Sequence, residues 1–335
     1  MIRKIALGAL VFASSVFAAN EVNIYSHRHY DTDKELFKKF EEKTGIKVNF
    51  VKAKASALIK RIESEGAKSP ADVLITVDAG RLYQAKQKNI LQPIESNYLM
   101  KNIPENLRDK DNQWFALTKR ARVTVFRKGS GIDKKLSTYE DLADPKFKDQ
   151  IMVRSSNNIY NQSLMAAIIA HHGEEYAEKW AKSVVANMAK SPKGNDRYQV
   201  KAVANGIGSV AIVNTYYIGK MVYNKDASQR ESVKKVDIFF PKFKNGGTHI
   251  NVSGAGVAKY APNKKNAIKF IEFLASKEAQ KIFAKGNYEY PVLHSVKASK
   301  LVSSWGEFKD DNISINTLGQ NNKAAVKVFD KAGWK

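Results

Sequence analysis

The chain has 335 residues, enough for about two domains that each bury a core of their own. Its 43% hydrophobic and 27% charged residues are typical of a globular protein. Lys and Arg number 56 against 33 Asp and Glu, and this net charge of +23 favours anionic ligands without selecting a fold. The sequence contains no cysteine, which excludes disulfides, thiolate nucleophiles and Cys-ligated metal sites. A metal would have to be held by His, Tyr, Asp, Glu or amide oxygens.

The N-terminus has the pattern of a secretory signal peptide. Arg3 and Lys4 precede an apolar run over residues 5–17, and the run ends in the small-x-small pattern that signal peptidase recognises. It is shorter than the ~20 residues that a membrane-spanning helix needs. We therefore expect residues 1–18 to be removed by cleavage after about Ala18, leaving an exported, soluble chain with 54 basic and 33 acidic residues.

The mature chain begins with alternating strands and helices. Thr32 and Glu35 form a capping box, which predicts a helix that ends at Gly45. The order β-α-β-α-β with apolar strands indicates an α/β sheet domain. The remaining elements of this block are expected as strands at 21–26, 46–51 and 72–77, with a second helix near 58–65.

A second α/β block follows two strands at 114–117 and 121–127. Its strands are expected at 150–154, 209–214 and 236–240, and its helices at 161–171, 174–189 and 198–205. The chain then returns with a strand at 250–260 and two helices within 266–285.

This order predicts an α/β fold of two lobes with a hinge and an interlobe cleft, since ligands in such sheets bind beyond the carboxyl ends of the strands. We expect the N-lobe to comprise residues 19–121 and about 248–300. The C-lobe would comprise residues 122–247 and about 301–335.

Three segments with metal-binding side chains each lie where a predicted strand gives way to a helix. They are the loop of His27, His29, Tyr30 and Asp31, the segment that leads to Tyr160, and the pair Tyr216 and Tyr217. Each segment alone has a simpler explanation as surface polarity, a helix cap or a packed aromatic ring. Their shared position at strand ends indicates that together they could enclose one ion.

Four phenolates and an imidazole suit Fe(III), a hard trivalent ion that can displace the proton of a phenol whose free pKa is ~10. Fe(III) with four phenolates carries a net charge of −1, which a guanidinium would balance. Arg120 and Arg122 lie on one face of a predicted strand and could do so, although solvated surface charge is an equally simple explanation.

Four segments, at residues 25–33, 117–123, 155–160 and 214–219, resemble the ferric-ion-binding solute receptors of bacterial iron ABC importers (FbpA type). Residues 267–280 also look like the closing helix of that superfamily. The resemblance implies a two-lobed, bacterial transferrin-like receptor in the periplasm. Such a receptor binds ferric iron in its cleft and delivers it to an inner-membrane ABC permease.

The resemblance also implies roles for individual residues. The family's metal-binding tyrosine pair falls on Tyr216 and Tyr217, and its N-lobe histidine falls on His29. Tyr30 and Tyr160 match the subgroup that uses four tyrosines and does not depend on a synergistic anion. The resemblance would place Arg120 or Arg122 near the anion position of the anion-dependent relatives, and it leaves carbonate or water open as a further ligand.

Other functions remain open from the residues alone. The cleft could hold another anionic or organic solute against its tyrosines. His27, His29 and Asp31 could form the metal site of a non-haem iron enzyme, although three ligands on one tight loop would be strained. The basic residues do not alternate with aromatics in one cluster, so we expect no nucleic-acid partner. We also expect a monomer and no enzymatic activity.

Overall fold

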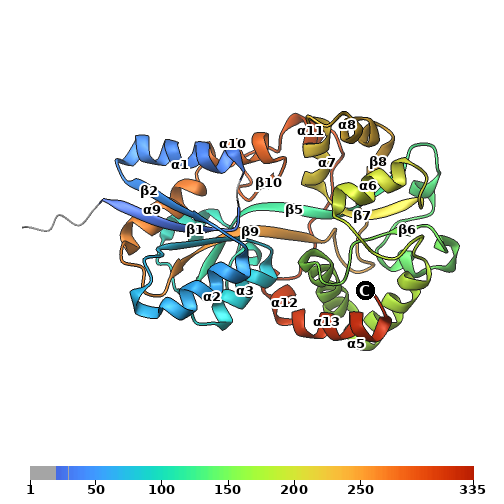
Figure 1. Cartoon of the computed structure of the whole chain (residues 1–335), viewed down its shortest axis with the longest axis horizontal. Helices are drawn as coiled ribbons and strands as arrows, with labels where there is room; N and C mark the ends of the chain where they lie inside the picture. The colour runs from blue at the N-terminus through green and yellow to red at the C-terminus, as the bar shows by residue number, and fades with distance from the viewer. Residues whose placement is uncertain (1–19, 29) are drawn as a thin grey trace, which may run out of the picture.

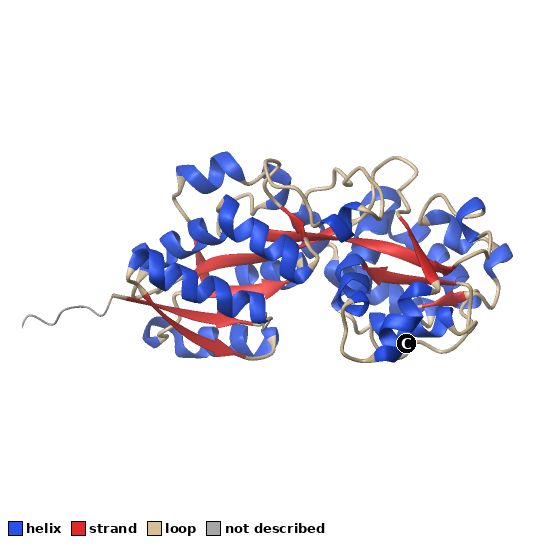
Figure 2. Cartoon of the chain, turned by 90° about the horizontal axis from the view of Figure 1, so that it is seen from above, coloured by secondary structure: helices blue, strands red, loops and turns tan. Residues whose placement is uncertain are grey.

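The computed structural model describes residues 20–28 and 30–335. The predicted signal peptide and His29 therefore lie outside the described residues. Two groups of strands and helices are connected by two long strands, β5 (Trp114–Arg127) and β9 (Ile250–Ala258), as Figures 1 and 2 show. This two-lobed α/β architecture confirms the predicted fold class. Within the described part of the chain, no helix is long and apolar enough to cross a membrane.

The strands form one continuous path in the order β2-β1-β3-β9-β5-β7-β6. Strand β1 pairs in parallel with β2 and β3, and β9 is antiparallel to both of its neighbours β3 and β5. Three further strands attach to this path, β4 to β9 and both β8 and β10 to β5. The strands besides β5 and β9 span Glu21–Ser26 (β1), Lys47–Lys52 (β2), Val73–Val77 (β3), Leu91–Gln92 (β4), Ile151–Met152 (β6), Val210–Asn214 (β7), Val236–Phe239 (β8) and Tyr290–Pro291 (β10).

Strand β5 changes partners along its length. It pairs with β9 as far as Ala121 and with β7 from Arg122 onward. The predicted division into strands at 114–117 and 121–127 is wrong, because β5 is continuous through a register shift between Ala116 and Thr118. The polar residues in its middle interrupted the apolar pattern, yet Thr118 and Arg120 are buried and bond to other buried side chains.

The helices cover both faces of the sheet (Figure 1). The two helices predicted at 161–171 and 174–189 form one element, α5, with a break at Gly173, whose φ of 82° is not helical. The helices span Asp31–Thr44 (α1), Ala55–Glu65 (α2), Ala79–Gln87 (α3), Asn97–Asn102 (α4), Ile159–Ala186 (α5), Asp196–Ala204 (α6), Thr215–Val222 (α7), Ala227–Lys234 (α8), Lys264–Leu274 (α9), Lys277–Asn287 (α10), Lys300–Ser303 (α11), Ile315–Gln320 (α12) and Asn322–Ala332 (α13).

Helix α1 begins earlier than its predicted capping box. Its N-cap is Tyr30, whose backbone N–H donates to the Asp33 carboxylate at 3.0 Å. Thr32 lies within the helix instead, and its hydroxyl donates to the side-chain oxygen of Asn287 at 3.1 Å. The prediction of a cap by Thr32 and Glu35 is therefore wrong. The Asp33 carboxylate, and not Glu35, accepts the hydrogen bond from the backbone N–H of the N-cap residue, and Thr32 packs against α10.

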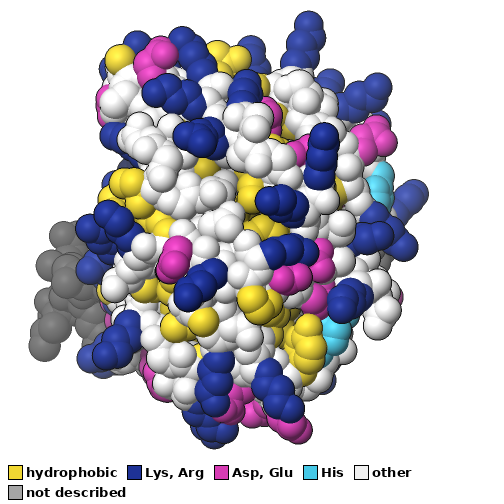
Figure 3. Space-filling view, turned by 90° about the vertical axis from the view of Figure 1, so that its right-hand side faces the viewer, with side chains coloured by type: hydrophobic (Ala, Val, Ile, Leu, Met, Phe, Trp, Pro, Cys, Tyr) yellow, Lys and Arg dark blue, Asp and Glu magenta, His cyan; other side chains and the backbone are white. Residues whose placement is uncertain are grey.

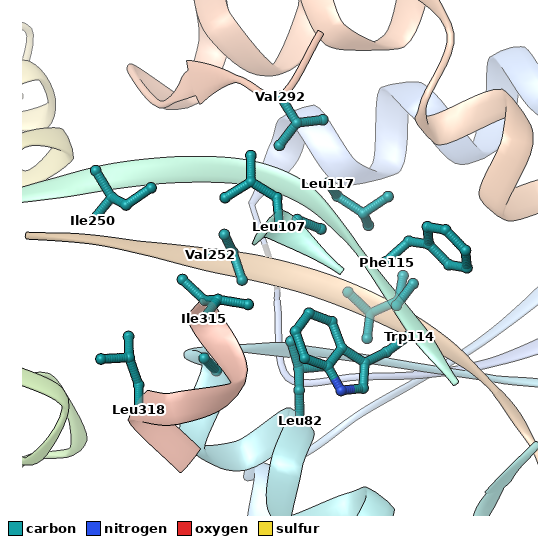
Figure 4. Packing of buried hydrophobic residues seen from close by; sticks show 14 of the residues in the cluster. Leu82, Leu107, Trp114, Phe115, Leu117, Ile250, Val252, Val292, Ile315 and Leu318 are labelled. Atoms are coloured by element: carbon teal, nitrogen blue, oxygen red, sulfur yellow. The ribbon is translucent and has the colours of Figure 1, made fainter. Parts of the chain in front are cut away.

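A hydrophobic cluster fills the junction beside the crossing strands. Ile315 and Leu318 of α12 lie next to Leu82 of α3, Val252 of β9 and Trp114 of β5 (Figure 4). All five side chains are buried. The short helix α12 therefore anchors the C-terminal segment at the base of the molecule, between α3 and α5.

Candidate metal centre

The structure places the four predicted tyrosines at three junctions between a strand and a helix. Tyr30 precedes α1 just after β1, Tyr160 is in the first turn of α5 after β6, and the pair Tyr216 and Tyr217 begins α7 directly after β7. All four line one pocket of about 260 Å³. Segments that are far apart in sequence thus meet, as their positions at strand ends predicted.

The phenol groups of Tyr160, Tyr216 and Tyr217 are in close contact. The hydroxyls of Tyr160 and Tyr216 lie 3.2 Å apart, within hydrogen-bond distance. The rings of Tyr216 and Tyr217 are stacked with their centroids 4.3 Å apart, so these neighbours point the same way rather than diverging. The turn from β7 into α7 produces this arrangement. His29 lies outside the described residues, whereas His27 lines the same pocket.

Burial keeps the phenols of Tyr30, Tyr216 and Tyr217 protonated when no cation is present. It raises the pKa of Tyr30, with a further contribution from the Glu289 carboxylate. It also raises the pKa of Tyr216 well above 10 and that of Tyr217 to about 12, and the neighbouring Tyr160 adds to both shifts. Only a strongly charged cation can compensate the ionisation of several such groups. The donor set therefore favours a trivalent ion.

Three arginines surround the ring of Tyr160. The guanidinium carbons of Arg120, Arg122 and Arg154 lie 5.6, 6.0 and 5.6 Å from its centroid. Arg120 and Arg122 are both buried and approach the same ring, in agreement with their predicted common face. They are not solvated surface charges.

Buried acceptors hold these arginines in place. The Asp196 carboxylate accepts hydrogen bonds from Arg122 at 2.6 Å and Arg154 at 2.5 Å. Arg120 is held more loosely, with Ser253 at 3.3 Å and Asp78 at 3.8 Å. Arg154 was not predicted as a site residue, although its position at the end of a predicted strand was a usable signal.

Two further cations adjoin Tyr30. The ammonium of Lys220 lies 3.0 Å from the centroid of the Tyr30 ring and 5.8 Å from that of Tyr216. Burial lowers the pKa of Lys220 to about 7. Arg28 is buried and paired with Asp33 at 3.2 Å and with Glu289 at 3.0 Å. Arg28 belongs to the first candidate loop, whereas Lys220 was not predicted, although it follows Tyr216 by four residues and so shares its helix face.

The alternative metal site on the first loop lacks its carboxylate. The side chain of Asp31 is fully exposed and lies 3.5 Å from the ammonium of Lys34. Across residues 20–28 and 30–335, no three His, Asp or Glu side chains form a group that could hold a metal. The pocket's potential metal donors are thus mainly phenolic, and Asp31, the carboxylate of the iron-enzyme alternative, is not among the residues that line it.

Comparison with known proteins identifies similar structures. A structure of Trichodesmium IdiA (FutA) in complex with iron and citrate ligands has a TM-score of 0.92 and 50% identity, covering 94% of this chain and all of the other. The ferric binding protein from Campylobacter jejuni has a TM-score of 0.88 and 47% identity, covering 94% of this chain and all of the other.

The sequence comparisons agree with the structural ones. Iron uptake protein A1 of Synechocystis is 50% identical over 315 residues, which cover 94% of this chain and 88% of that protein. The family of bacterial extracellular solute-binding proteins matches residues 68–308. Because this match spans most of the chain and the sequence relative covers nearly all of it, the protein belongs to the bacterial extracellular solute-binding proteins.

Proposed function

We propose that this protein is a periplasmic receptor that binds ferric iron and delivers it to an inner-membrane ABC permease. The observation that carries the proposal is the convergence of Tyr30, Tyr160, Tyr216 and Tyr217 on one pocket. Their phenolates, with the imidazole of His29, supply the hard anionic donors that Fe(III) prefers. The names of the iron-binding relatives support the same function.

Iron binding stabilises the closed form of the two lobes. We assign residues 19–121 and about 248–300 to the N-lobe, and residues 122–247 and about 301–335 to the C-lobe. Tyr30 then belongs to one lobe and the other three tyrosines to the second. An ion that contacts both lobes favours closure through its higher affinity for the closed form. The closed receptor acts as a monomer, presents iron to the permease and catalyses no reaction.

Charge balance explains the cations around the pocket. Fe(III) with four phenolates carries a net charge of −1, and the arginines around Tyr160 together with Lys220 offset it. Arg120 and Arg122 act from behind the tyrosines rather than as ligands. Water or carbonate completes the coordination of the ion.

The basic surface does not require a nucleic-acid partner. On the face that Figure 3 shows, Lys and Arg side chains are spread among acidic and uncharged residues instead of forming one patch. A general positive potential of this kind attracts anionic forms of iron.

A titration of the iron-free protein with ferric nitrilotriacetate tests the function. Tyrosinate ligation produces a visible charge-transfer band, which the double variant Tyr216→Phe with Tyr217→Phe should lose. Tyr260→Phe is the matched control, because Tyr260 is exposed and outside the pocket. A wild-type protein that stays colourless would rule out ferric binding by these tyrosines.

A further inference from the structure

A second and larger cavity adjoins the tyrosine pocket. Its volume is about 660 Å³, compared with about 260 Å³ for the tyrosine pocket. It lies between α3 on one side and the N-terminal turns of α5 and α13 on the other. We call it the α3–α5 groove. Arg81 lines both cavities, so the groove meets the tyrosine pocket at this side chain.

Close packing defines the walls of the groove. Gly80 lies so near Ile159 that a Cβ atom there would come within 3.2 Å of the Ile159 methyl group. The side-chain amide of Asn322 donates to that of Gln162 at 3.1 Å, which connects α13 to α5. The groove is therefore bounded mainly by helices in contact, with Asn157 of the turn before α5.

The lining of the groove is cationic and amide-rich, and it contains no carboxylate. In the described part of the chain, Arg81 and Lys323 form no ion pair, and the recorded bond of the Arg81 side chain is a 3.4 Å contact with the carbonyl of Val77. Lys88, at the far end of the groove, is paired with Glu63 at 3.0 Å. Two cations without counterions, surrounded by amide donors, suit a ligand with several negative charges.

We propose that the α3–α5 groove binds a small polycarboxylate, the organic anion of an arriving ferric chelate. The iron part of this inference rests on the proposed function. The tyrosine pocket has room for an ion and one small ligand, whereas the groove can hold an organic anion beside it. Arg81 lies at the boundary, where it can contact the anion as the metal passes to the phenolates.

The test uses tricarballylate, which has three carboxylates but no hydroxyl group and is therefore a weak ligand of iron. Calorimetric titration of the iron-free mature chain should show saturable binding. Lys323→Gln should weaken it by about fivefold or more, since it removes one charge-assisted contact. Lys327→Gln removes the same charge from an exposed side chain of α13 that does not line the groove, and it should leave the affinity unchanged. No saturable binding, or equal losses in both variants, would overturn the proposal.

Two further measurements locate the anion and separate this proposal from iron binding. Tyr160→Phe changes only the tyrosine pocket, so tricarballylate should bind it as it binds the wild type. Loss of binding in Tyr160→Phe would place the anion among the tyrosines and contradict the groove site. Lys323→Gln should still develop the visible band with ferric nitrilotriacetate, which shows whether iron binding survives independently of the groove.

Discussion

The ammonium of Lys220 lies 3.0 Å from the centre of the Tyr30 ring. Tyr30 precedes α1 and Lys220 lies in α7, so the contact joins the two sides of the tyrosine pocket. In the part of the chain that the structure describes, no carboxylate forms an ion pair with Lys220. A buried cation against an aromatic face contributes about 2 kcal/mol, and it gains further once the phenol ionises.

Lys220→Met should weaken ferric binding by about tenfold or more, because it removes a positive charge beside the phenolates while keeping the length of the side chain. Competition with nitrilotriacetate measures this change. Lys220→Arg should restore most of the affinity. The control is Lys225→Met, which removes an exposed lysine from the same region. Equal affinities in Lys220→Met and the wild type would exclude a role for this charge.

Tyr160→Phe should shift the visible band and lower the iron affinity without abolishing colour. The variant removes one phenolate donor and the 3.2 Å contact with Tyr216, but it leaves the stacked pair Tyr216 and Tyr217 intact. Absorption spectra and chelator competition report the two effects. The same spectrum and affinity as the wild type would remove Tyr160 from the ligand set.

Iron binding should release protons and weaken as the pH falls. Burial raises the pKa of Tyr217 to about 12, so this phenol is protonated in the iron-free protein at neutral pH. The iron-free state thus holds more protons, and acid favours it over the iron-bound state. We expect a net release of about three to four protons per iron. The number is slightly below four because Lys220, with a pKa of about 7, takes up a fraction of a proton when phenolates form beside it.

Proton release can be followed with an indicator in weak buffer, after subtraction of the protonation of the chelator. Tyr217→Phe should release about one proton fewer than the wild type. A net release of about one or none in the wild type would be incompatible with four phenolate ligands.

His249 should make the iron-free protein less stable in acid. Burial, assisted by Arg122 and Arg120, lowers the pKa of this imidazole to about 3, compared with about 6.5 in an unfolded chain. Between these values the unfolded state binds the additional proton, so stability falls as the pH drops below about 6.5. At pH 5 the loss from this residue is about 2 kcal/mol.

Urea unfolding at pH 7.5 and pH 5 measures this effect. Between pH 7.5 and pH 5, the free energy of unfolding of His249→Gln should fall by about 2 kcal/mol less than that of the wild type. His294→Gln, which changes an exposed histidine, should behave as the wild type does. An unchanged pH dependence in His249→Gln would contradict the assignment.

Asp196→Asn should destabilise the protein by about 3 kcal/mol, because the carboxylate is buried and holds both Arg122 and Arg154. The amide has the same shape but leaves two cations without a countercharge. Asp226→Asn is the control, since Asp226 is exposed and Asn is also a good N-cap residue. Thermal unfolding should show a large loss for the first variant and little for the second.

Local sequence patterns predicted much of the site. Tyr30, Tyr160 and the pair Tyr216 and Tyr217 follow apolar strands and precede helices, and the structure keeps them at those junctions. Arg154 and Lys220 were not predicted. Arg154 ends a predicted strand and Lys220 follows Tyr216 by four residues, but these local signals do not indicate that the two cations approach the rings of Tyr160 and Tyr30. Arg120 looked like a surface charge as much as a buried one, and only the packing of β5 against β9 shows that it is buried.

The amino-acid sequence by itself determined the types of donor and the order of strands and helices, because apolar periodicity and turn residues act over short distances along the chain. The tertiary structure decided which side chains meet. Strand β5 changes its partner at Ala121 and Arg122, and this change brings the ends of β1, β6 and β7 to one pocket. Helix α12 packs the C-terminal segment against α3. Such contacts depend on pairings between distant segments, and therefore on the burial of the whole sheet rather than on any local pattern.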